Sequence, residues 1–99
     1  MGEKRKFPAI AGFVRGYLHE DAIPEYGSAT AAAQQFCRDA DSKQVENLRH
    51  EWKMFRQENP NLNDVNRSLQ GLGSAWLFQT IDEFQQMLDA TEKSPRVGL

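Results

Sequence analysis

The sequence contains one cysteine and no long apolar run. Cys37 has no second cysteine in the 99 residues to pair with, so an internal disulfide is excluded. Its alanine-rich surroundings predict a buried thiol, and a protein without disulfides fits a reducing compartment. A basic segment, 1–6, precedes residues that Pro8 and two glycines interrupt, so we expect neither a secretion signal nor a membrane span. These features predict a cytoplasmic protein.

Strand signals and a large excess of one charge are also missing. No segment alternates apolar and polar residues, and no Asn-Gly or Asp-Gly hairpin turn occurs. The net charge of −2 gives the molecule no general attraction to nucleic acid or to an anionic membrane. The length suits a single domain over residues 1–99 with one core, and we expect flexible ends at 1–6 and 92–99.

Helical periodicity dominates the rest of the chain and predicts an all-α, single compact bundle of about five helices. The predicted helices cover an apolar run over 7–18 and segments that begin at Ser28, at 41–42, at 61–63 and at Thr80. The apolar stripes predict these core residues: Phe13, Tyr17, Phe36, Leu48, Trp52, Phe55, Leu69, Trp76, Leu77 and Phe84. The charges of the third helix balance in sign and predict a solvated face: Glu46, Arg49, Glu51, Lys53 and Arg56.

Residues able to support catalysis are present but scattered. His19, Glu20 and Asp21 are adjacent, so their side chains point in different directions, and a zinc site needs about four convergent ligands. Cys37 has no neighbouring base. The glycine-rich segment 71–74 lacks the preceding strand and the lysine of a phosphate-binding loop. The sequence therefore predicts no enzymatic activity, no metal and no cofactor.

Acidic residues gather in two places. Glu20, Asp21 and Glu25 share a segment with Tyr26, and residues 19–28 contain no lysine or arginine. The last helix carries a second acidic set: Asp82, Glu83, Asp89 and Glu92. A helix dipole favours acids in a first turn, so part of the second set has a structural explanation.

Three short motifs resemble a known family. Residues 17–21 read Tyr-Leu-His-Glu-Asp, an aromatic and an aliphatic residue followed by His, an acid and Asp; Leu72-Gly73 and Trp76-Leu77 follow later. Together they resemble the small immunity proteins of bacterial contact-dependent growth inhibition systems, over roughly Phe7 to Leu88. An aromatic residue commonly follows the Asp in that family, whereas Ala22 stands here.

The resemblance implies a non-enzymatic protein that binds the toxic C-terminal domain of a cognate contact-delivered effector and occludes its active site. The toxin of such a system can be a nuclease, whose cationic cleft would attract carboxylates. On this basis the predicted toxin-binding residues are Glu20, Asp21, Glu25, Tyr26, Asp82, Glu83 and Asp89. A helical adaptor that binds another cellular protein is the alternative. Nucleic-acid binding through residues 4–6 has little support, because no basic helix accompanies them.

Overall fold

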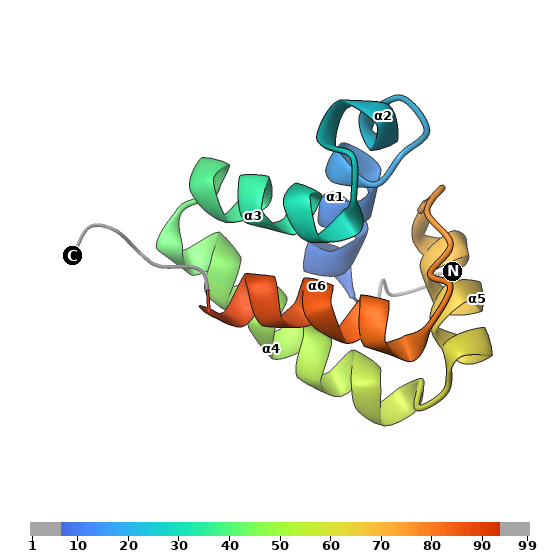
Figure 1. Ribbon diagram of the computed structural model, residues 1–99. Helices are drawn as coiled ribbons and strands as arrows, with labels where there is room; N and C mark the ends of the chain where they lie inside the picture. The colour runs from blue at the N-terminus through green and yellow to red at the C-terminus, as the bar shows by residue number, and fades with distance from the viewer. Residues whose placement is uncertain (1–6, 94–99) are drawn as a thin grey trace, which may run out of the picture.

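The computed structural model describes residues 7–93, which form helices joined by short segments (Figure 1). The helices are α1 (Pro8–Tyr17), α2 (Ala22–Tyr26), α3 (Ala29–Asp39), α4 (Ser42–Glu58), α5 (Leu62–Leu72) and α6 (Ile81–Lys93). The all-α class is confirmed, since residues 7–93 contain no strand. None of the helices in this range combines the length and the apolar character that crossing a bilayer requires.

The number of helices differs from the prediction because of α2. This five-residue helix lies in the segment 19–28, which its polar composition predicted to be a loop. Pro24 is tolerated there because the first turn of a helix leaves its N–H groups unpaired. Gly27 has a φ of 85°, a conformation that glycine adopts without strain, and it follows the end of the helix. A helix this short shows no apolar period in the sequence.

The C-terminal helix is longer than predicted. Helix α6 continues through Glu92 to Lys93, whereas the sequence predicted a flexible end from residue 92. Residues 1–6 and 94–99, the remainder of the predicted flexible ends, lie outside the described part of the chain.

Local capping places most of the helix starts. The Ser28 hydroxyl accepts the N–H of Ala31, and the Asn61 side chain accepts the N–H of Asp64. At α4 the predicted capping box is present: Asp41 accepts the N–H of Gln44 at 2.8 Å and its own N–H donates to the Gln44 side chain at 3.0 Å. These starts are therefore encoded within four residues of sequence.

The alanines of α3 allow close packing against α6. Ala29, Ala32 and Ala33 are buried, and α3 runs beside α6 through the middle of the molecule (Figure 1). The thiol of Cys37 is also buried and donates to the carbonyl oxygen of Thr91 at 3.8 Å. The predicted buried thiol is thus confirmed, and it contacts the last turn of α6.

Aromatic rings form the centre of the core. Trp52 of α4 is almost fully buried, and its ring meets Phe13, Phe55 and Phe84 edge-on at centroid distances of 5.5 to 6.3 Å. The indole N–H of Trp52 has no hydrogen-bond partner among residues 7–93. Tyr17, Phe36 and Trp76 from the predicted core are only partly buried, at its edge.

The prediction of Leu77 as a core residue is wrong. Leu77 is 50 % exposed, whereas the next residue, Phe78, is 2 % exposed and enters the core. Residues 74–80, which we call the strap, connect α5 to α6 without helical structure. Side chains of an extended segment alternate between two sides, so a helical stripe through Leu77 and Ile81 does not apply here.

Charged residues of α4 support its neighbours rather than forming only a solvated face. Glu51 accepts the free N–H groups of Ala9 and Ile10 at the start of α1, at 3.1 and 2.9 Å. Arg49 donates to the carbonyl oxygens of Thr91 and Glu92 at the end of α6. Each pairing matches the sign of the helix dipole. Because the partners lie more than 40 residues away in the sequence, local spacing gives no sign of them.

Candidate functional site

The end of α1 turns the chain so that two carboxylates face solvent. The Nδ1 atom of His19 accepts the N–H of Asp21 at 3.2 Å, and the carbonyl oxygen of His19 accepts the N–H of Ala22 at 3.0 Å. These bonds close a tight turn between α1 and α2. Glu20 and Asp21 lie within that turn, and both are exposed. His19 therefore shapes the backbone from which the two acids project.

A row of stacked aromatic rings lies behind these acids. Phe13 stacks on Tyr17 with a centroid distance of 5.8 Å, and Tyr17 stacks on Tyr26 at 5.7 Å. The row runs from the core to the surface, and Tyr26, at its outer end, is partly exposed. The Tyr26 hydroxyl forms no hydrogen bond with residues 7–93. Stacking thus fixes the ring of Tyr26 while leaving its polar end available.

Asp39, at the end of α3, joins this region through Tyr17. The Tyr17 hydroxyl donates to one oxygen of Asp39 at 2.7 Å, and the side-chain amide of Gln35 donates to the other at 2.9 Å. Partial burial, together with the bond to Asp39 and its charge, raises the pKa of Tyr17 to about 12. The bonds from Tyr17 and Gln35 lower the pKa of Asp39. Sequence reasoning missed Asp39, because 22 residues separate it from Tyr17.

We call the set formed by Glu20, Asp21, Glu25, Tyr26 and Asp39 the acidic corner. The side-chain carboxylates of Glu20, Asp21 and Glu25 form no hydrogen bond or ion pair with the described residues, and all three are exposed. With no lysine or arginine between residues 19 and 28, their charge has no local compensation. The four residues predicted in this segment follow the turn and α2, and Asp39 is linked to Tyr26 through the ring of Tyr17. Their part in binding stays a prediction.

The acids of α6 are used differently. Both carboxylate oxygens of Glu83 accept hydrogen bonds from the strap: one from the indole N–H of Trp76 at 3.1 Å and one from the N–H of Gln79 at 2.8 Å. Asp89 accepts from Gln85 and is partly buried, while Asp82 is exposed. Helix α3 lies between α2 and α6 (Figure 1), so the two predicted acidic sets occupy separate parts of the molecule.

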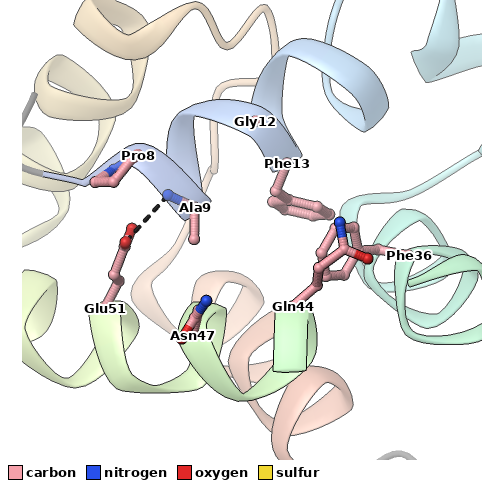
Figure 2. Close-up of a pocket in the computed structure, with 8 residues that line it drawn as sticks. All are labelled: Pro8, Ala9, Gly12, Phe13, Phe36, Gln44, Asn47 and Glu51. Carbon is pink, nitrogen blue, oxygen red and sulfur yellow. Dashed lines mark hydrogen bonds between the residues drawn. The ribbon is translucent and has the colours of Figure 1, made fainter. Parts of the chain in front are cut away.

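A groove of about 440 Å³ separates α1 from the start of α4 (Figure 2). Ala9 and Gly12 leave it open, and the rings of Phe13 and Phe36 form its apolar end. Its carboxylate, Glu51, is occupied by the N–H groups of α1. The amide side chains of Gln44 and Asn47 complete the lining. None of these groups is a nucleophile or an acid–base pair, so the groove offers apolar contact and hydrogen bonds only.

Metal-ligating side chains do not converge within residues 7–93. No three His, Cys, Asp or Glu residues in this range are arranged to hold an ion. The candidate site, the acidic corner, consists of exposed carboxylates beside a partly exposed aromatic ring.

A known protein family matches most of this chain. The family model described as CdiI immunity protein matches residues 6–77. The chain belongs to the CdiI immunity protein family. No curated protein and no solved structure gives a significant match.

Membership of the CdiI family implies toxin neutralisation in general, with a toxin protein as the partner. The predicted resemblance is confirmed, although the match ends at Leu77 instead of extending to Leu88. The matched range contains the whole acidic corner and most of the strap. It leaves out α6 and therefore all the acids of the second predicted set.

Proposed function

We propose that this CdiI-family protein neutralises the toxic C-terminal domain of one contact-delivered effector by covering its active site with the acidic corner. The observation that carries the proposal is the group of three exposed carboxylates, Glu20, Asp21 and Glu25, which no donor or cation among residues 7–93 satisfies. Binding a cationic partner there breaks no interaction within this range, so the carboxylates are available to the complex.

Charge complementarity supports an inhibitory role. A toxin that cleaves nucleic acid holds phosphates with lysine and arginine side chains. Carboxylates presented at the same spacing speed association and compete with those phosphates. The proposed partner surface is therefore the cationic cleft of the toxin domain, and covering it blocks the substrate.

Tyr26 adds an aromatic contact beside the carboxylates. Tyrosine is enriched among the residues that dominate binding energy, because its ring gives large contact area at low entropic cost. The stack on Tyr17 already restricts the ring, which lowers that cost further. Its unpaired hydroxyl can donate to the toxin, and its ring edge can pack against the stem of a basic side chain.

We assign the acids of α6 a secondary place in binding. Glu83 contributes its carboxylate to the strap, and Asp89 is partly buried. Asp82 and Asp89 extend the negative field of the molecule and help to steer a cationic toxin toward it.

Co-expression tests the proposal directly. Cells that produce the toxin domain encoded beside this gene are expected to survive when they also produce this protein, and cells that produce an unrelated toxin are not. The purified complex is expected to bury about 1,200–2,000 Å² in total. If the protein neither binds nor protects against that domain, the proposal is wrong and the adaptor alternative is favoured.

A further inference from the structure

Leu77 is an apolar side chain held out into solvent. Leu77 and Met54 are the two large hydrophobic residues that stand clearly exposed in the described chain, at 50 % and 42 %. Met54 lies on the solvent side of α4, where a single apolar residue is ordinary. Ala75, two residues before Leu77 and therefore on the same side of the extended strap, is also exposed. Trp76, between them, is half-buried and packs against the core. Ala75 and Leu77 thus form a small exposed apolar face of the strap.

The strap that carries Leu77 is fixed on both sides of it. Before Leu77, the Ser74 hydroxyl accepts the N–H of Trp76 at 3.0 Å, and the indole of Trp76 donates to Glu83. After it, the side-chain amide of Asn66 bonds both the N–H and the carbonyl oxygen of Phe78, at 2.9 and 3.0 Å. The backbone at Leu77 is thus ordered before any partner arrives, which lowers the entropic cost of binding.

The strap also touches the acidic corner. The N–H of Ala75 donates to the carbonyl oxygen of Leu18 at 2.8 Å, and Leu18 directly precedes the turn that carries Glu20. Consecutive Cα atoms are about 3.8 Å apart, so the Cα atoms of Leu77 and Glu20 lie no more than about 22 Å from each other. A standard interface covers about 800 Å² on each partner, a patch roughly 30 Å across. One partner of ordinary size can therefore contact both.

We propose that Leu77 is the apolar anchor of the toxin interface, entering an apolar pocket of the toxin domain beside the cationic surface that the acidic corner meets. This inference rests on the proposed function and assigns a second chemistry to the same partner. The acidic corner supplies charge, which governs the association rate. Leu77, once buried in the complex, supplies apolar contact, which governs the dissociation rate. The occupant is the toxin domain, because continuity with the acidic corner demands a partner with basic groups next to its pocket.

Leu77→Asp and Met54→Asp form a matched pair for the test. The binding partner is the purified toxin domain encoded beside this gene, and surface-immobilised kinetics give the rate constants. Leu77→Asp is expected to weaken binding at least about 30-fold, mostly through faster dissociation. Met54→Asp is expected to leave binding unchanged, and both variants should melt at the wild-type temperature. Leu77→Ala, which adds no charge, should show the same change in dissociation at smaller size.

The outcomes separate this inference from the proposed function. Unchanged dissociation in both Leu77 variants, while a reversal of Glu20 and Asp21 still weakens binding, overturns the anchor and leaves the function standing. A large drop in melting temperature for Leu77→Ala overturns the anchor too, because Leu77 would then be a folding residue. Dimerisation of the wild type that Leu77→Asp abolishes without loss of toxin binding assigns Leu77 to self-association instead. If the wild type fails to bind the toxin domain, the proposed function fails first.

Discussion

The acidic corner and the acidic face of α6 carry similar charge but differ in what their carboxylates do. In the corner, Glu20, Asp21 and Glu25 point to solvent and have no partner among the described residues. On α6, both carboxylate oxygens of Glu83 accept hydrogen bonds from the strap, and Asp89 accepts a hydrogen bond from Gln85. Acidic composition alone therefore does not identify a binding surface. The free carboxylate is the one available to a partner, and the satisfied one contributes to the fold.

The largest expected effect is a loss of stability from a substitution in the core, which supports both the acidic corner and α6. Trp52→Ala is expected to lower the free energy of unfolding by about 3–5 kcal/mol, because it leaves a cavity among Phe13, Phe55 and Phe84. Trp52→Phe should cost much less, since it also removes an indole N–H that has no partner. Denaturant unfolding measures both. Equal losses for the two substitutions would show that the cavity is not the cause of the destabilisation.

Charge reversal separates binding from folding in the corner. Glu20→Lys combined with Asp21→Lys is expected to weaken toxin binding by at least about 2 kcal/mol, most strongly at low salt, because the reversed charges repel a cationic surface. The free energy of unfolding should stay within about 0.5 kcal/mol of the wild-type value. Association kinetics at two salt concentrations, with thermal melting as the control, test this. If the double variant unfolds instead, the turn at His19 depends on these two acids.

Removing the Glu83 carboxylate should have the opposite effect: it should lower the free energy of unfolding rather than weaken toxin binding. Glu83→Ala leaves the indole N–H of Trp76 and the N–H of Gln79 without an acceptor, so we expect a loss of about 1–3 kcal/mol in unfolding free energy. The neighbouring Asp82→Ala serves as the control and should cost less than about 1 kcal/mol, the usual value of a helix-dipole interaction. Chemical denaturation decides. Similar losses for both variants would remove the distinction between the two acids.

Tyr17→Phe probes the bond that brings Asp39 into the corner, and a smaller loss of stability than for Glu83→Ala is expected. The raised pKa of Tyr17 means that its contribution is present below about pH 10 and is lost as the pH rises to about 12. The lowered pKa of Asp39 means that its contribution is present at neutral pH and is lost as the pH falls through its folded-state pKa. The gap in melting temperature between wild type and variant should therefore narrow at both extremes. A gap that stays constant with pH would contradict this pairing.

The smallest effect is expected from the exposed acid of α6. Asp82→Lys should leave toxin affinity within about a factor of two of wild type, because only long-range steering is lost. A loss as large as that of the corner variant would show that the interface extends to α6. The same binding assay, run side by side, makes the comparison direct.

The sequence could predict the features that depend on residues close together in the chain. The capping residues Ser28, Asp41 and Asn61 placed three helix starts, because each bond spans three positions. The motif around His19 pointed to the family and to the corner. Asp39 was not predicted, because its partner Tyr17 belongs to another helix and no local sequence pattern indicates a contact between the two. Leu77 was misplaced because a helical period was extended into a segment that hydrogen bonds hold straight.

The carboxylate of Glu51 has a consequence for the order in which the molecule assembles. Helix α1 starts at Pro8 without a side-chain cap of its own, and among residues 7–93 the side chain that accepts its free N–H groups belongs to α4. Helix α4, with 17 residues and a complete capping box, carries its own start signal. We therefore expect α4 to form early and α1 to become ordered only when it docks. The amide protons of Ala9 and Ile10 then serve as built-in reporters of that docking, and their exchange with solvent measures how often α1 detaches.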